Sequence, residues 1–160
     1  MADLTQAAPQ EITATLEEVV RRRAGLYQAI LALEQAAAEP ADGREEQWAG
    51  AAVEALEAVE REIVDHIEIT ERDHGLYDEI IDVAPRLSRN IDLLRGEHPE
   101  MHEATATLRA RLASAPPRDG QAVTETREAI GVVLAQLVSH RRRGADLLWE
   151  AYSLDTGGGE

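Results

Sequence analysis

The feature that most constrains the fold is an apolar periodicity with alternating steps of three and four residues, which places apolar side chains along one face of a helix. Four segments show it, at about residues 9–38, 45–72, 85–114 and 123–154. In the last segment the apolar series includes Ile130, Val133, Leu137 and Leu147. The sequence therefore predicts four long amphipathic helices.

The connections between these segments are short and contain helix-breaking residues. Pro40 to Gly43 separates the first two segments, and residues 114–120 separate the last two. The stretch 76–83 is predicted as a short helix, because Pro85 disfavours helical geometry at Ala84. Pro99 predicts a kink or a break in the third helix. The predicted fold class is all-α: an antiparallel four-helix bundle, up-down-up-down, with a short extra helix between helices two and three.

Length and composition narrow the classes of protein that remain. A chain of 160 residues fits a single domain, 1–160, and we expect loose termini at 1–9 and 155–160. The absence of cysteine excludes disulfides and thiolate metal sites, and a reducing, cytoplasmic location is expected. No signal peptide and no apolar run of about 18 residues is present, so no membrane association is predicted. A formal net charge of −15 disfavours nucleic acid as a partner.

Polar side chains interrupt the apolar series once in each long segment, at Arg23, His66, His98 and His140. A polar group buried in a bundle costs several kcal/mol unless a partner satisfies it. A lone buried histidine is more often hydrogen-bonded than metal-bound, but three imidazoles on three helices can share one metal ion. We therefore expect the three histidines to lie in the interior and to converge.

The positions of the loops predict which residues of neighbouring antiparallel helices lie at the same height along the bundle. Midway between His98 and His140 lies Asp119, beside the predicted loop, so these two side chains should face each other. The midpoint of Arg23 and His66 falls past the first loop, which predicts an offset of about one helical turn, ~5 Å.

Two local motifs add candidate ligands. His98 and His102 are four residues apart and can share one helix face, although His102 is equally compatible with a solvent-facing position. Glu71 and His74 have the Glu-x-x-His spacing of carboxylate di-metal bundles, a weak signal at a helix end. Glu97 is a further candidate carboxylate. The predicted metal ligands are His66, Glu71, His98, His102 and His140.

Several short motifs resemble one family. They are DHIEITE at 65–71, APRL at 84–87, LRGEH at 94–98 and HRRRGADLLWEAY at 140–152, with the tail LDTGG at 154–158. The chain is similar in these segments to the hemerythrin-like, HHE cation-binding proteins, particularly bacterial ones. The resemblance spans most of the chain through short, degenerate motifs.

The resemblance implies a four-helix bundle that holds a non-haem di-iron centre through histidines and bridging carboxylates. Members of the family carry or sense dioxygen, handle nitric oxide or peroxide, or store iron. Carried onto this sequence, the family's histidines match His66, His98, His102 and His140. The expected cofactor is non-haem iron, one or two ions, and the expected partner is a small diatomic ligand or peroxide.

Three positions depart from the family's pattern. The first helix offers Arg23 where a histidine is expected. Thr70 stands four residues after His66 where a carboxylate is expected, with Glu71 one step round the helix. Asp146 follows His140 by six residues where five are usual. A single metal, an altered metal pair and no metal therefore all remain open.

Two hypotheses follow. The first is an iron-binding bundle that senses, binds or reacts with dioxygen, nitric oxide or peroxide, or handles iron, and the number of histidines in the apolar series favours it. The second is a metal-free helical-bundle interaction module, in which Arg23 forms a buried ion pair with a carboxylate such as Glu62. The fixed charge of Arg23 favours this second hypothesis, because a cation in the core repels a divalent metal. The sequence decides neither an enzymatic activity nor an oligomeric state.

Overall fold

The computed structural model describes the backbone of residues 8–153 and the side chains of residues 17–153. The predicted loose termini fall largely outside this range, since residues 1–7 and 154–160 are not described. The first helix begins at Ala8.

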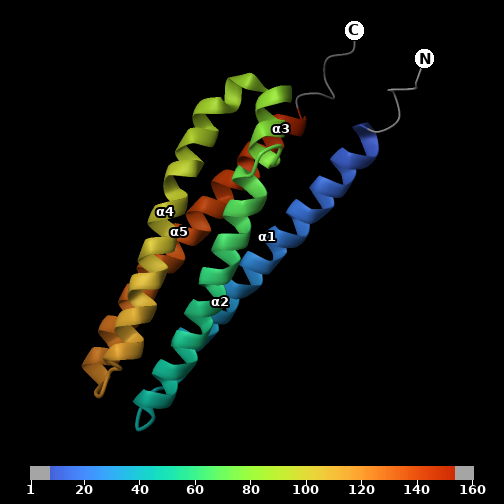
Figure 1. The fold of residues 1–160 in the computed structure, drawn as a ribbon. Helices are drawn as coiled ribbons and strands as arrows, with labels where there is room; N and C mark the ends of the chain where they lie inside the picture. The colour runs from blue at the N-terminus through green and yellow to red at the C-terminus, as the bar shows by residue number, and fades with distance from the viewer. Residues whose placement is uncertain (1–7, 154–160) are drawn as a thin grey trace, which may run out of the picture.

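Residues 8–153 form helices joined by short connections and contain no strand. Its long helices are α1 (Ala8–Ala38), α2 (Glu45–Glu71), α4 (Ser88–Ser114) and α5 (Gly120–Ser153). A short helix, α3 (Leu76–Val83), and a 3-10 turn (Pro85–Leu87) connect α2 to α4. The predicted all-α bundle with a short extra helix is confirmed, and Figure 1 shows successive long helices running in opposite directions. No helix between residues 8 and 153 is long and apolar enough to cross a membrane.

At the end of the bundle opposite α3, side-chain hydrogen bonds to the backbone stabilise the start of α5 and the end of α1. The Asp119 carboxylate accepts a hydrogen bond from the Ala122 N–H at 2.8 Å, which satisfies a free amide at the start of α5. Arg127 of α5 donates to the carbonyl oxygens of Ala37 and Glu39, where α1 ends. These bonds tie the end of α1 to α5.

The break expected at Pro99 does not occur, because α4 continues through it from Ser88 to Ser114. Proline removes one backbone hydrogen bond, but the residues on either side still face the core: His98 and Met101 are 1% exposed. Packing on both sides of the proline therefore keeps the helix intact. The predicted start at residue 85 is a 3-10 turn rather than the first turn of α4.

The buried interior consists of two apolar regions with a polar layer between them. We call the larger region, at the end with the α1–α2 and α4–α5 loops, the loop-end core; it includes Leu33, Trp48, Leu56, Ile63, Met101, Ile130 and Leu137. We call the other region, packed around α3, the α3-end core; it includes Val19, Ile69, Tyr77, Ile80, Leu94 and Leu147. The boundary falls at the same level on three helices. Members of the two cores flank His66 on α2, His98 on α4 and His140 on α5.

Candidate metal centre

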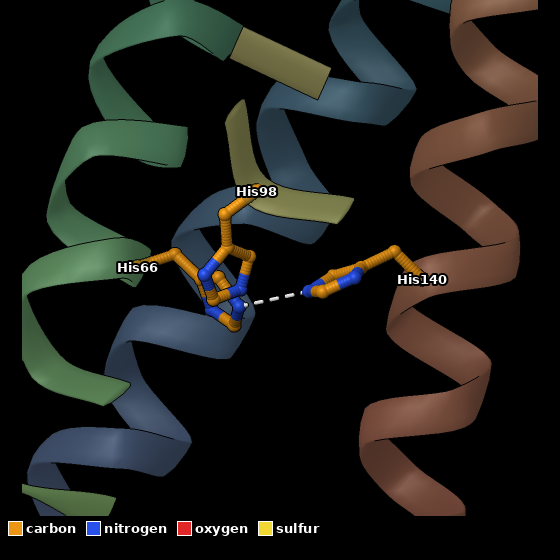
Figure 2. Close-up of side chains that lie close together, drawn as sticks. All are labelled: His66, His98 and His140. Carbon is orange, nitrogen blue, oxygen red and sulfur yellow. Dashed lines mark hydrogen bonds between the residues drawn. The ribbon is translucent and has the colours of Figure 1, made fainter. Parts of the chain in front are cut away.

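Three buried histidines meet in the layer between the two cores. His66, His98 and His140 are 7%, 1% and 2% exposed, and one ring nitrogen of each lies within 4.8 Å of the others. The ring centroids are 4.9–5.2 Å apart and the rings meet edge to face. Figure 2 shows His66 and His98 pointing to one place, with His140 approaching from the opposite helix. The expected convergence is therefore present.

Two carboxylates hold the outward-facing nitrogens of this cluster. Nδ1 of His140 donates to Oε2 of Glu97 at 2.7 Å, and Nδ1 of His98 donates to Oε1 of Glu71. A proton on Nδ1 leaves the lone pair on Nε2, which in His140 faces His66 and in His98 faces the Tyr77 hydroxyl. Carboxylate-to-histidine contacts of this kind orient the imidazole ligands in many metal sites.

The inward-facing nitrogens are close to one another. Nε2 of His66 lies 3.1 Å from Nε2 of His140. In a tetrahedral site with metal–nitrogen bonds of about 2.1 Å, the ligand nitrogens are roughly 3.4 Å apart. The His66–His140 pair, at 3.1 Å, is about 0.3 Å closer than this. The full set, spread over up to 4.8 Å, would have to close by roughly 1.4 Å to hold a metal ion.

Burial lowers the pKa of all three imidazoles. The pKa of His66 falls well below its ordinary value, first through burial and then through the charges of His98, His140 and Arg23. Burial likewise lowers the pKa of His98 and His140, while Glu71 and Glu97 oppose the shift in part. The lowered pKa values favour neutral rings at pH 7. Because Nδ1 of His140 donates to Glu97, the His66–His140 hydrogen bond places a proton on Nε2 of His66, and a metal ion bound there would displace that proton.

Tyr77 completes the cluster and was not anticipated from the sequence. Its hydroxyl lies 3.4 Å from Nε2 of His98, and its ring stacks on that imidazole with centroids 6.0 Å apart. Burial raises the pKa of Tyr77, so the phenol keeps its proton and acts as a donor. Its sequence signal was the one-sided spacing of Leu76, Tyr77 and Ile80 in the short helix.

A cavity of about 20 Å³ opens beside the cluster, on the side facing α1. Polar residues in its wall are Arg23, His66, Thr70, Tyr77, His140 and Arg141, and the remainder is mostly apolar. A volume of this size holds one water molecule or a ligand of similar size. The cavity therefore gives a small molecule a place next to the inward-facing nitrogens of His66 and His140.

Arg23 brings a positive charge to the wall of this cavity. Its Nη2 donates to the carbonyl oxygen of Arg141 at 3.2 Å, and its Nη1 lies where a side chain at Gly144 would meet it at 3.1 Å. Burial, followed by the charge of Arg141, lowers the pKa of Arg23, but a guanidinium stays protonated. The long side chain reaches the level of His66 and His140 despite the predicted offset of its helix position.

The ion pair proposed between Arg23 and Glu62 is not formed. Among residues 17–153, Arg23 has no carboxylate within ion-pair distance. The carboxylate of Glu62 lies instead against Gly25, where an added Cβ would be 2.6 Å from Oε2. Arg23 is thus a cation whose hydrogen-bond partner in the described structure is a neutral carbonyl.

Two of the predicted ligands are placed differently from the three histidines. The side chain of His102 is 41% exposed, and its Nε2 is 4.0 Å from Glu60, because it lies on the flank of α4 rather than on the buried face. Glu71 contacts the outward nitrogen of His98, so it orients that ring instead of facing the centre of the cluster.

Three further positions singled out in the sequence contribute no ligand to the cluster. His74 is exposed, with its backbone N–H donating to Asp78. Asp146 is exposed on α5. Thr70 lines the cavity, but its hydroxyl donates to the carbonyl oxygen of His66 at 2.8 Å.

Comparison with protein-family models, with curated proteins and with solved structures gives no match to this chain. The resemblance to the hemerythrin-like family therefore stays a prediction that rests on the short motifs alone.

Proposed function

We propose that the protein binds one divalent transition-metal ion, iron, through Nε2 of His66, His98 and His140. The observation that carries this proposal is the convergence of three buried, neutral imidazoles, two of which have Nδ1 fixed by a carboxylate. Dioxygen, nitric oxide or peroxide would bind at an open position of the metal beside the cavity. Imidazole ligands accept zinc, copper and nickel as well as iron, so iron itself is proposed on the family resemblance.

One ion is proposed rather than two because the layer offers no bridging carboxylate. Glu71 and Glu97 are both engaged on the outer side of the histidines. The first-helix position that would complete a second site holds Arg23, whose charge repels a second dication.

The surrounding residues have definite roles around such an ion. Three protein ligands leave coordination positions open, and the bound metal would supply Lewis-acid or redox chemistry there. Glu71 and Glu97 keep the protons of His98 and His140 on Nδ1. Tyr77 offers a hydroxyl donor next to Nε2 of His98. The apolar residues of the two cores exclude bulk water from both ends of the layer.

The test is calorimetric titration of the metal-free protein with iron(II) under anaerobic conditions, repeated with zinc(II). We expect one site per chain in the wild type and in His74→Ala, which removes an exposed histidine. His140→Ala should lose this site. If His140→Ala binds iron as the wild type does, the ligand set is wrong. If zinc binds and iron does not, the metal site stands and the iron assignment fails.

A second candidate function, the metal-free interaction module, is favoured by one observation. Each imidazole of the cluster already has a polar partner: His66 pairs with His140, and Tyr77 and Glu71 pair with His98. Such a network satisfies buried rings without an ion. In this case the wild type takes up no metal in the titration, and the functional surface lies outside the layer.

A further inference from the structure

A groove between α2 and α4, which we call the α2–α4 groove, leads from the surface to the histidine cluster. Its volume is about 560 Å³, and its wall includes Val64, Glu71, His98 and His102. A second hollow, of about 430 Å³, adjoins it and shares Val64 and His102. A water molecule takes up about 30 Å³ in the liquid, so the groove has room for a divalent ion with its shell of water. His98 therefore belongs both to the buried cluster and to the wall of a groove that admits a hydrated cation.

The two carboxylates that contact the cluster are held differently. Glu97, which accepts from His140, also forms an ion pair with Arg143 at 2.5 Å. Glu71, which accepts from His98, lies in the wall of the groove with 32% of its side chain exposed. Among residues 17–153, Glu71 forms no ion pair with an arginine. Since a partly exposed side chain can exchange rotamers, Glu71 is the movable carboxylate of the two and Glu97 the fixed one.

The approach to the cluster from the side of α1 is unfavourable for a cation. The cavity there measures about 20 Å³, and its wall contains Arg23 and Arg141 but, among residues 17–153, no carboxylate. Two positive charges repel a dication before it reaches the imidazoles. The α2–α4 groove instead presents the carboxylate of Glu71, and the charge of Arg95 in its wall is offset by an ion pair with Asp78.

We infer that divalent metal ions enter and leave the histidine cluster through the α2–α4 groove, and that Glu71 is the residue that passes them. The inference rests on the proposed function and names the route to that site. Glu71 binds the cation in the groove and then turns, which uncovers the ring of His98. Val64 and His102 lie further out, where the two hollows meet. Glu71 therefore lowers the barrier to the passage of the ion in both directions.

The test compares rates with affinity for cobalt(II), a coloured probe that binds imidazole more tightly than iron(II) does. Metal-free protein is mixed rapidly with cobalt(II) and the visible absorption is followed, and release is followed after an excess of chelator is added. Val64→Trp places a large side chain over the groove at a residue that is 51% exposed. It should slow association and dissociation together, each about tenfold, and leave the dissociation constant within about threefold of the wild type. Leu93→Trp, in the wall of the groove between α4 and α5, is the matched control and should leave both rates unchanged.

A second pair of variants tests the carboxylates and does not depend on tolerance of a large side chain. Glu71→Gln removes the negative charge that meets the cation in the groove, so association should slow about tenfold. Glu97→Gln leaves the groove intact, so it should weaken binding mainly through faster release, with association close to the wild-type rate.

The outcomes separate this inference from the proposed function. If the wild type binds no cobalt(II), both fail. If the wild type binds it, and Val64→Trp and Glu71→Gln associate at the wild-type rate, the metal site stands and the route is overturned. Slower association in Leu93→Trp but not in Val64→Trp would also overturn the route, because the ion would then enter between α4 and α5. Faster release with unchanged association in Val64→Trp would likewise contradict it, because the substitution would then act on the site and not on the path to it.

Discussion

The layer formed by His66, His98 and His140, here called the histidine layer, lies in the same bundle as the loop-end core. Both regions are built on the same spacing of three and four residues, but their buried side chains differ in chemistry. In the loop-end core, Leu56 and Ile130 are fully buried among apolar side chains. About three turns further along each helix, His66 and His140 occupy the equivalent positions and are also buried, at 7% and 2% exposed. The first region uses its buried positions for packing, whereas the second places ionisable groups there and keeps a cavity beside them.

Buried positions of one helical bundle can therefore serve either packing or binding. Apolar side chains stabilise the bundle by leaving water and filling space. Buried imidazoles contribute less, since each must find a hydrogen bond or a ligand to offset its lost hydration. Perturbing the two regions in parallel should therefore change stability in one case and binding in the other.

The largest change in stability is expected in the loop-end core. Leu56→Ala leaves a cavity among side chains that cannot fully collapse, and the free energy of unfolding should fall by about 2–5 kcal/mol. Denaturant unfolding measures it, with Val132→Ala, which truncates a side chain 71% exposed, as the control. The number of metal ions bound per chain should stay the same. A change in the number of ions bound per chain would show that packing in the loop-end core also controls metal binding by the histidines.

A carboxylate that touches a histidine should affect metal affinity instead. Glu97→Gln removes the charged acceptor that orients His140, so the affinity should fall about 10–100-fold. Competition with a chelator of known affinity measures this change. Glu103→Gln alters an exposed carboxylate on the same helix and should have no such effect. Equal metal affinities for the two variants would show that Glu97 does not support metal binding through His140.

Acid should destabilise the metal-free protein through the histidine layer. Because burial lowers the pKa of His66, His98 and His140, the unfolded chain binds protons at a pH where the folded protein does not. Stability is therefore fully present above about pH 6.5 and is lost as the pH falls towards the lowered values. The free energy of unfolding should therefore fall as the pH is lowered from 6.5 to 5, as measured by denaturant unfolding at each pH.

The matched control for this prediction replaces all three histidines by leucine. In that variant the acid dependence over the same interval should be much smaller. A wild type and a triple variant with identical pH profiles would contradict the assignment of the dependence to the layer.

The smallest effect on stability is expected for His98→Leu in the metal-free protein. An imidazole without a metal contributes little more than apolar volume, and Glu71 is 32% exposed and can rehydrate. Thermal or denaturant unfolding should differ from the wild type by less than about 1.5 kcal/mol. A loss as large as that of Leu56→Ala would mean that the hydrogen-bond network itself stabilises the bundle.

Much of the fold could be predicted because helix periodicity is a local property of the sequence. Segments 76–83 and 45–72 match α3 and α2 to within one residue. Of the kink or break predicted at Pro99, the break is absent for a tertiary reason, because packing on both sides of the proline keeps α4 continuous. The burial of His66, His98 and His140 could be predicted for the same reason as the helices, because each occupies a core position.

The surroundings of the histidines could not be predicted. Which nitrogen faces inward depends on Glu71 and Glu97, which reach the rings across helices. Tyr77 reaches His98 only because of the path taken by α3. His102 shares a helix with His98, yet a small rotation about the axis places it on the exposed flank. Contacts between helices depend on rotations and offsets that a single sequence does not contain.

The measurement that tests the central claim most directly is the metal content of protein purified from iron-supplemented medium, determined by elemental analysis. If His66, His98 and His140 bind one iron ion, the wild type and His74→Ala should contain close to one iron per chain, and His140→Ala almost none. A wild type without stoichiometric metal, or a His140→Ala variant that retains as much iron as the wild type, would contradict it.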